Sequence, residues 1–257
     1  MSFRVLVLGL LLATAAPSIA APLASARRTI VLVSSVEARD TEDGRWLALI
    51  FREALRRIGY DFELAGYPIL RAAKMADSGA VDGEINRAAD YADGHPSLVR
   101  VDESLSSHAF AAYAGRPLTL GEGWAGLVGR GYRVECRAGV LRCETQTRQL
   151  LPAGQVSSVY SAQLALRKLQ VGRTDLYIDV EEVVDGMLAT GEFAGSPVRK
   201  VGVVEMFKGY AFLHQKNRAL AAPLAAALAA MKREGLFEKY HQQVQARAAA
   251  GAASPRP

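Results

Sequence analysis

A glycine-rich segment has the spacing of a nucleotide-binding signature. Residues 121–126 read GEGWAG, and their three glycines match the dinucleotide fingerprint. That fingerprint binds a pyrophosphate when it joins a strand to the N-terminus of a helix. The next predicted strand begins at Tyr132, which leaves no room for such a helix. We therefore interpret the segment as a loop and expect no cofactor.

The residues that could support metal or hydrolytic chemistry are scattered along the chain. His95, His108, His214 and His241 are far apart and lack the spacing of metal ligands. The sequence also lacks the G-x-S-x-G turn on which many serine hydrolases hold their nucleophile. We therefore predict neither a catalytic residue nor a metal site.

Cys136 and Cys143 are the two cysteines of the chain. Two sulfurs without a neighbouring histidine or a second cysteine pair do not complete a tetrahedral zinc site. Disulfides persist in oxidising compartments, and the N-terminal sequence indicates export to one. We predict a bridge between the two cysteines, with free thiols as the main alternative.

The N-terminus has the features of a secretory signal peptide. Arg4 precedes an apolar run over residues 5–16, and Pro17 and small residues follow up to Ala20. The run is too short for a membrane-spanning helix, which needs about 20 apolar residues. We predict a signal peptide over residues 1–20 and localisation in the periplasm. Cleavage after Ala26 and an uncleaved anchor are the alternatives.

Length and composition restrict the class of protein. The chain has 257 residues, which suits two lobes or one large α/β domain. Half of the residues are hydrophobic and 22% are charged, which excludes a disordered chain. The net charge is +5, but the lysines and arginines are spread along the sequence. We therefore expect no nucleic-acid partner.

Strands and helices alternate in the first half of the chain. Residues 29–33 form a β-branched apolar run that is typical of a strand buried on both faces of a parallel sheet. Apolar residues then recur at helical spacing from Gly44 to Ile58, and Gly59 ends that pattern. The same reasoning predicts further strands over 61–64, 80–82, 98–101 and 108–113, and a helix over 69–76.

A second alternating series follows a glycine-dense zone over residues 121–131, which we interpret as a lobe boundary. Repeated βαβ units indicate a parallel sheet. The second series comprises strands over 132–136, 155–156 and 175–178, helices over 144–151, 159–169 and 183–188, a return strand segment over 198–213 and a helix over 220–231.

This order predicts an α/β protein with two lobes. Lobe 1 would comprise residues 27–114 and 205–246, lobe 2 would be inserted over 115–204, and residues 247–257 would form a flexible tail. Two connecting segments between stiff lobes act as a hinge. Ligands of α/β sheets bind at the carboxyl ends of the strands, which here face the cleft between the lobes.

Several segments resemble the type II periplasmic solute-binding proteins, in the amino-acid-binding group called family 3. One segment is similar to a proline-arginine helix that precedes a G-x-x-D-G strand and an arginine. Another segment is similar to the group's helix-to-strand motif, which ends in G-R-x-D. Two further segments resemble the last strand and the last helix of the group. The matching segments are residues 66–71, 79–87, 165–179, 209–213 and 231–235.

The resemblance implies a two-lobed fold with two hinge strands and a receptor without catalytic activity. Such a receptor would capture a small polar or carboxylate-bearing solute, similar to an amino acid, by hinge closure. It would act as a monomer and deliver the solute to a membrane ABC permease. The alternatives are a periplasmic sensor module and an enzyme on the same fold, of the cyclohexadienyl or arogenate dehydratase kind, with Glu84 as general acid or base.

The resemblance also implies ligand contacts in the first lobe. Arg87 stands where the group places its carboxylate-binding arginine, and a guanidinium offers the bidentate geometry that a carboxylate needs. Arg71 is the companion candidate. Glu84 could bind a ligand ammonium or Arg87 itself. Tyr113, at the end of a crossing strand, is expected either to form a wall of the cleft or to pack in the core.

In the second lobe the group uses an aspartate after the G-R-x-D strand to bind an α-ammonium group. Asp179 is the nearest match but stands one residue early, and one residue reverses the face of a strand. The Ser/Thr-rich anion loop of the group is absent, since residues 137–140 read RAGV. The aromatic-proline pair is also absent after the first strand, where residues 34–37 read SSVE. The ligand class therefore remains open between a carboxylate and another small polar solute.

Overall fold

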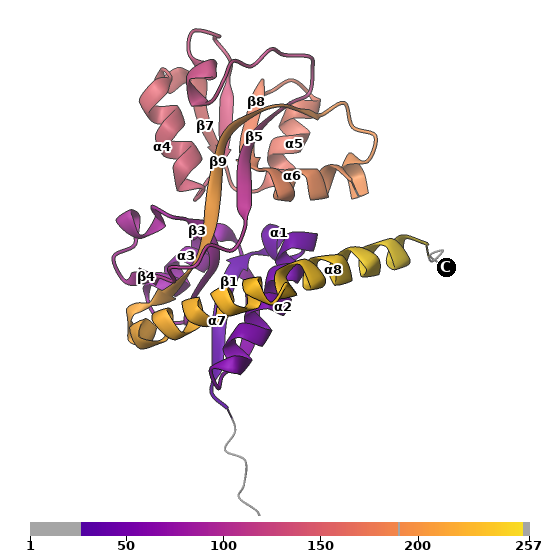
Figure 1. Cartoon of the computed structure of the whole chain (residues 1–257). Coiled ribbons are helices and arrows are strands. Elements are labelled where there is room, and N and C mark those ends of the chain that lie inside the picture. Colours follow the sequence, from indigo (N-terminus) through magenta and orange to yellow (C-terminus); the bar gives the residue numbers. More distant parts are fainter. Residues whose placement is uncertain (1–26, 190, 254–257) are drawn as a thin grey trace, which may run out of the picture.

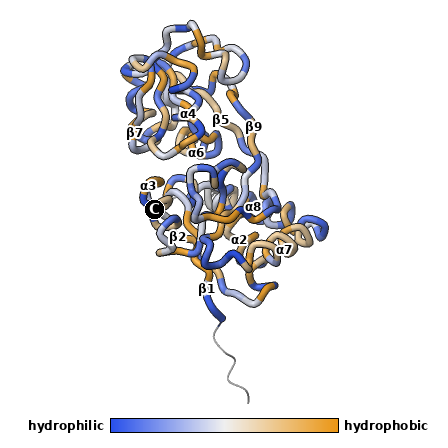
Figure 2. The backbone as a smooth tube through the Cα atoms, turned by 90° about the vertical axis from the view of Figure 1, so that its left-hand side faces the viewer, coloured by the Kyte–Doolittle hydropathy of each residue, from blue (hydrophilic) through white to orange (hydrophobic). Residues whose placement is uncertain are grey.

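The computed structural model describes residues 27–189 and 191–253. The predicted signal peptide over residues 1–20 lies outside these ranges. Two lobes lie one above the other, and strands β5 (Ser107–Ala114) and β9 (Arg199–His214) run between them (Figure 1). In the rotated view the two strands lie along one side of the molecule, where they connect the lobes (Figure 2). The predicted two-lobed α/β fold with two hinge strands is confirmed.

The first lobe contains a mixed sheet with the strand order β2-β1-β3-β9. β1 pairs in parallel with β2 and β3, whereas β9 is antiparallel to β3 and to the short strand β4. The parallel strands end at the edge that faces the second lobe, which is where an α/β sheet presents its ligand-binding loops. The strands are β1 (Thr29–Ser35), β2 (Asp61–Tyr67), β3 (Gly83–Ala88) and β4 (Leu98–Arg100).

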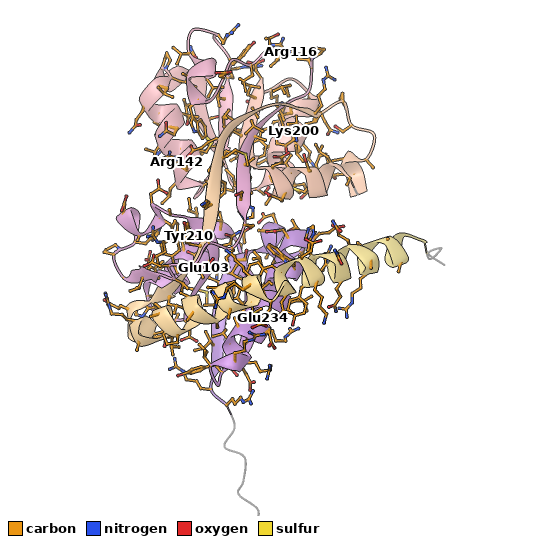
Figure 3. The ribbon with its side chains drawn as sticks, in the orientation of Figure 1. Glu103, Arg116, Arg142, Lys200, Tyr210 and Glu234 are labelled. Carbon is orange, nitrogen blue, oxygen red and sulfur yellow. A yellow bond between two sulfur atoms is a disulfide. The ribbon has the colours of Figure 1, made fainter. Side chains whose placement is uncertain are left out.

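Helices cover both faces of this sheet. They are α1 (Val36–Arg39), α2 (Glu42–Arg57), α3 (Ile69–Asp77), α7 (Ala221–Arg233) and α8 (Leu236–Ala253). The C-terminal helices return to the first lobe and pack on α2. Glu234, labelled in Figure 3, follows α7 and accepts a hydrogen bond of 2.7 Å from Arg57 of α2. The first and last described segments of the chain therefore lie in the same lobe.

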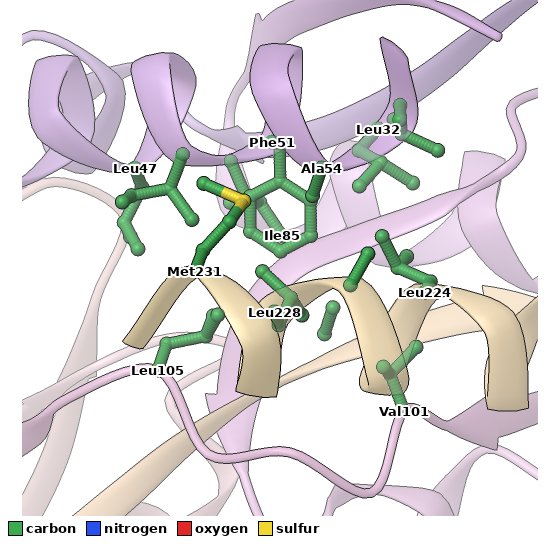
Figure 4. Packing of buried hydrophobic residues seen from close by; sticks show 14 of the residues in the cluster. Leu32, Leu47, Phe51, Ala54, Ile85, Val101, Leu105, Leu224, Leu228 and Met231 are labelled. Atoms are coloured by element: carbon green, nitrogen blue, oxygen red, sulfur yellow. The ribbon is translucent and has the colours of Figure 1, made fainter. Parts of the chain in front are cut away.

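Helix α2 carries part of the site. The packing of its apolar face and the cap on its first turn hold it in place. Its apolar side chains, among them Phe51, pack against Met231 and Leu228 of α7 (Figure 4). Burying a side chain of this size contributes roughly 1.5 to 3 kcal/mol to the free energy of unfolding. At the start of the helix Thr41 Oγ1 accepts the N–H of Gly44 at 3.0 Å, which caps the first turn.

The second lobe has the strand order β5-β8-β6-β7, and β9 lies on the other side of β5. Its remaining strands are β6 (Val134–Arg137), β7 (Val156–Val159) and β8 (Leu176–Val180). Its helices are α4 (Leu141–Leu150), α5 (Ala162–Gln170) and α6 (Glu181–Leu188). Short 3-10 helices occur at η1 (Tyr91–Gly94), η2 (Trp124–Leu127), η3 (Ala153–Gln155), η4 (Gly191–Phe193) and η5 (Gln215–Leu220).

The sheet pairing shows how each connecting strand relates to the lobes. β5 pairs with β8 from Phe110 opposite Val180 to Tyr113 opposite Tyr177, so its whole length lies in the second sheet. β9 is a single strand that pairs first with β5 and then with β3. The lobe limits at residues 114 and 205 stay predictions. β5, which those limits assign to lobe 1, is hydrogen-bonded into the sheet of the second lobe.

Two elements differ from the sequence-based expectation. The third strand begins at Gly83 rather than at residue 80, because residues 80–82 form a turn after Gly79, which has a φ of +71°. Asp82 closes this turn by accepting the N–H of Val31 at 3.0 Å. Helix α8 continues to Ala253, so the described part of the predicted tail is helical.

The predicted disulfide is confirmed. Cys136 of β6 and Cys143 of α4 are bonded, with their Cα atoms 5.9 Å apart. Both cysteines are fully buried. The bridge therefore ties the first helix of the second lobe to a central strand, next to the residue at which that strand reaches the interlobe cavity.

Candidate ligand-binding site

A cavity of about 470 Å³ lies between the lobes. Both lobes contribute to it: β1, the start of α2 and the end of β3 from one lobe, and β5, the end of β6 and the start of α4 from the other. In Figure 3 Arg142 lies on the side of the second lobe that faces the first, and its Nη1 is 3.2 Å from Asp90 Oδ2. The charged lining residues are Asp43, Glu84, Arg87, Asp90, Asp93, Arg137, Arg142 and Glu182.

Glu84 near the start of β3 and Arg87 near its end contact each other because that strand is irregular. Residues three apart point to opposite faces of a regular strand. The pairing of β3 with β9 shifts register between Glu84 and Arg87, and such a bulge redirects side chains. Arg87 Nε consequently donates to Glu84 Oε2, and the Tyr91 hydroxyl donates to Glu84 Oε1 at 2.6 Å.

Part of the Arg87 guanidinium is available to a ligand. Its Nη2 atom is buried and has no hydrogen-bond partner among the described residues. Burial alone would lower the pKa of the Arg87 guanidinium, but the negative charge of Glu84 holds that pKa above its ordinary value. Arg87 therefore lines the cavity as a permanent cation whose Nη2 group is available to a ligand.

Arg137 at the end of β6 joins the lobes. Its guanidinium lies 2.8 Å from Asp179 Oδ2 of β8 and donates to Glu37 Oε2 of α1 at 3.1 Å. Arg137 and Asp179 are both buried, and Tyr177 also donates to Asp179. Burial would lower the pKa of Arg137, yet Asp179 and Glu37 keep it raised. The charge of Asp179 is therefore neutralised inside the protein.

A polar cluster lies at the hinge end of the cavity, around His108 of β5. His108 Nδ1 is 2.9 Å from Glu182 Oε1 of α6, and His108 Nε2 is 2.5 Å from Ser106 Oγ. The order hydroxyl, imidazole, carboxylate is that of a hydrolase triad. However, Nε2 also lies 2.9 Å from Asn86 Nδ2, so the nitrogen that would act as base is shared by two partners.

The carboxylate of Asp43, from the first turn of α2, completes this cluster. Burial raises the pKa of Asp43, and the nearby charge of Glu182 raises it further. Burial would lower the pKa of His108, but its hydrogen bond to Glu182 and the charge of Asp43 raise it above the ordinary value. Two carboxylates and one imidazole therefore share a poorly solvated space.

The residues that the sequence singled out do not all meet. Glu84 and Arg87 line the cavity together. Tyr113 is fully buried in the core of the second lobe, and its hydroxyl donates to Asp185 at 2.6 Å. Arg71 is exposed on α3, with its guanidinium over the ring of Tyr67 at 5.0 Å. Asp179 is not among the lining residues, because Arg137 covers it.

Sequence reasoning missed most of the polar lining. The sequence predicts no side-chain role for Asp43, Arg137 or Glu182, and it gives His108 no partner at the spacing of metal ligands. These residues come from four different elements, and successive members of the set are 29 to 65 positions apart along the chain. No local spacing links them, so we find no signal in the sequence that would have grouped them.

Two further properties concern the ranges 27–189 and 191–253. Within them no group of three or more histidine, cysteine, aspartate or glutamate side chains is arranged to hold a metal ion. None of the helices in the same ranges combines the length and the apolar composition that a membrane span requires.

The fold and the interlobe cavity define a protein of the type II periplasmic-binding-protein fold. An ancestral arginine-binding protein bound to glutamine superposes with a TM-score of 0.67 and 16% identity, over 84% of this chain and 97% of that one. A histidine kinase sensor domain similar to periplasmic binding proteins has the same TM-score and identity, over 84% and 96%. An arginine-bound amino acid ABC transporter substrate-binding protein from Streptococcus pneumoniae gives 0.65 and 13%, over 84% and 94%.

At these identities the structural similarity shows the fold. No family model matches the sequence. The chain is 35% identical over 218 residues to an uncharacterized protein of Shewanella oneidensis, which covers 85% of this chain and 83% of that protein. This chain belongs to the family of that protein.

Proposed function

We propose that this protein is a receptor that captures a small polar, amino-acid-like solute between its lobes by hinge closure. The observation that supports this proposal best is the cavity lined by both lobes around Arg87, whose buried Nη2 lacks a partner among the described residues. A ligand in that cavity contacts both lobes when they are closed. Its binding therefore shifts the population from open to closed molecules.

The closed form would be recognised by a membrane partner on the periplasmic side. An ABC permease is the partner we propose, since an amino acid ABC transporter substrate-binding protein has the same fold. The histidine kinase sensor domain with this fold makes a sensory role the second candidate. Deleting the gene should abolish uptake of the identified solute in the first case, and should abolish a transcriptional response with uptake intact in the second.

The primary experiment is a thermal-shift screen of the exported protein against amino acids, dicarboxylates and amines. A ligand that binds the native state raises the melting temperature by mass action. We expect at least one class to do so, with a dissociation constant that calorimetry then measures. The solute should be recovered unchanged after incubation, because a receptor performs no reaction. Chemical conversion of the solute would favour the enzyme alternative, and a panel without any shift would contradict solute capture.

A further inference from the structure

We propose that this cavity binds the cationic group of its ligand between Asp43 and Glu182, at the hinge end, and that the ligand is an organic amine or guanidine. This inference rests on the proposed function and names its ligand class. The carboxylate that the sequence suggested for this task, Asp179, is excluded by its ion pair with Arg137 and its hydrogen bond from Tyr177. A second cation there would have to displace a buried arginine.

Asp43 and Glu182 have the acceptor capacity that Asp179 lacks. Asp43 makes no hydrogen bond or ion pair with any described residue, although it lines the cavity. Glu182 uses Oε1 for His108, and its Oε2 is buried without a partner in the described part of the chain. A buried acceptor without a donor is costly, and an ammonium or guanidinium ligand supplies donors and charge together.

The two carboxylates belong to different lobes, which links cation binding to closure. Asp43 lies on α2 of the first lobe, and Glu182 lies on α6 of the second. A cation between them is contacted by both when the lobes are closed and by one when they are open. The cation therefore binds the closed form more tightly, which is the requirement for a ligand that drives closure.

A second cavity, of about 1130 Å³, leads to the same place. It shares Thr41, Asp43, Glu182 and Val183 with the first cavity. Its charged lining is acidic, with one arginine, Arg45, against several carboxylates. A cleft lined by one sign of charge concentrates ligands of the opposite sign and raises their association rate. The carboxylates are Glu37, Asp40, Glu42, Asp43, Glu182 and Glu238.

The acceptors favour an organic cation over a metal ion or an anion. The described residues hold no group of three or more metal-ligating side chains in a suitable arrangement. The cavity arginines are already paired, Arg87 with Glu84, Arg137 with Asp179 and Arg142 with Glu205. The Nη2 amino group of Arg87 has no hydrogen-bond partner among the described residues, and its N–H groups can serve a neutral or anionic acceptor elsewhere on the same ligand.

His108 provides a readout that does not depend on mutation. Its ring faces Asp43 of α2, Glu182 of α6, Ser106 and Asn86, and His241 of α8 lies close enough to act on Asp43. A protonated His108 and a ligand cation compete for the same two carboxylates. Binding of the cation should therefore release part of a proton from His108, and a neutral ligand should not.

The test uses the exported full-length protein with 1,4-diaminobutane and agmatine as cationic probes, and 1,4-butanediol and succinate as neutral and anionic probes. We expect the two cations to bind and to release protons in calorimetry near pH 7, in two buffers of different ionisation enthalpy. We expect Asp43→Asn and Glu182→Gln each to weaken cation binding at least tenfold. Glu63→Gln, which removes an exposed carboxylate outside both cavities, should leave affinity unchanged.

The outcomes separate this inference from the proposed function. A neutral or anionic solute that binds equally well to Asp43→Asn and Glu182→Gln would overturn the cation site and leave the receptor intact. Unchanged cation affinity in both variants would do the same. A protein that binds no solute of any class would overturn both. If circular dichroism shows that a variant does not fold, the test rests on proton release by the unmodified protein. Cation binding without proton release would then contradict the inference.

Discussion

At the scale of single residues, Arg87 and Arg137 differ in which of their guanidinium donors are already paired with carboxylates. Arg137 is held by Asp179 and Glu37, whereas Arg87 is held by Glu84 and keeps a buried Nη2 atom without a described partner. An unpaired donor in a poorly solvated cavity gains a full hydrogen bond when a ligand arrives. We therefore expect Arg87 to contribute to the affinity for the proposed ligand and Arg137 to contribute to the contact between the lobes.

We expect Arg87→Lys to weaken solute binding by roughly 1.5 to 3 kcal/mol, which is the range for hydrogen bonds that involve a charged group. Lysine keeps the positive charge beside Glu84 but lacks the planar fork of donors. Calorimetry with the solute from the screen measures the effect. Arg71→Lys is the matched control, because Arg71 is exposed and lies outside the cavity lining. Equal affinities in the two variants would remove Arg87 from the ligand site.

At the scale of elements, cross-links between strands and helices hold the cavity walls in place. The disulfide joins β6 to α4 beside Arg137, and Asp175 joins the start of β8 to the start of β6. Asp175 accepts the N–H of Arg133 at 2.9 Å and also binds the Arg133 and Arg116 side chains. The disulfide ties a strand to the helix that follows it in the chain, whereas Asp175 links two strands that are adjacent in the sheet but 42 residues apart. Each link reduces the independent motion of the segments that it joins.

We expect the double variant Cys136→Ser, Cys143→Ser to lose about 2 to 3 kcal/mol of unfolding free energy. The estimate follows from the loop entropy of a short closed loop, which the bridge removes from the unfolded state. Urea denaturation of the oxidised protein and the variant measures the difference. Addition of a thiol reductant should lower the stability of the natural protein to that of the variant and leave the variant unaffected. A loss well under 1 kcal/mol would contradict this role.

Asp175 gives an acid-dependent prediction. The hydrogen bonds from Arg133 lower the pKa of Asp175 to about 2. A carboxyl whose folded-state pKa is depressed contributes stability above its unfolded pKa, near 4, and that stability is lost as the pH falls through about 2. Because Arg133 is largely exposed, we expect about 1 kcal/mol.

Asp175→Asn should therefore reduce the unfolding free energy at pH 7 and leave it nearly unchanged at pH 2. Denaturation curves at both pH values test this difference. Asp61→Asn serves as a control, because Asp61 is an exposed aspartate for which the structure records no side-chain partner. A variant that is equally destabilised at both pH values would show that the side chain acts through packing instead of charge.

At the scale of the whole molecule, polar contacts across the cleft stabilise closure before any ligand is considered. Glu37 receives Arg137 at 3.1 Å, Asp90 lies 3.2 Å from Arg142, and Asn86 lies 2.9 Å from His108. Each contact joins a residue of the first lobe to one of the second. These contacts would be lost if the lobes opened, so we expect the open and closed forms to differ in ion pairing as well as in ligand contacts.

We expect Glu37→Gln to favour the open form, because it removes the first-lobe charge from Arg137 and leaves the Asp179 pair inside the second lobe. The radius of gyration of the ligand-free protein in small-angle scattering should increase. Solute affinity should fall by up to about tenfold, since the ligand must then pay for closure that the ion pair had favoured. Identical scattering from Glu37→Gln and Glu63→Gln would show that the Arg137 contact does not hold the lobes together.

Local patterns in the sequence determined the order of strands and helices, the two-lobed fold and the disulfide. The strands and helices follow from burial with a period of two or of 3.6 residues, the two lobes from the order of those elements, and the disulfide from the two cysteines of an exported chain. The family resemblance suggested Glu84 and Arg87, and the structure places both in β3 on the lining of the cavity.

Which charged side chains of the cavity remain unpaired depends on the tertiary structure. Asp179 pairs with Arg137, which stands 42 positions earlier in the chain, and nothing in the sequence indicated this pairing. Asp43 of the first lobe lines the interlobe cavity together with His108 and Glu182 of the second. Such contacts depend on the packing of whole elements, and residue spacing along the chain carries no information about that packing.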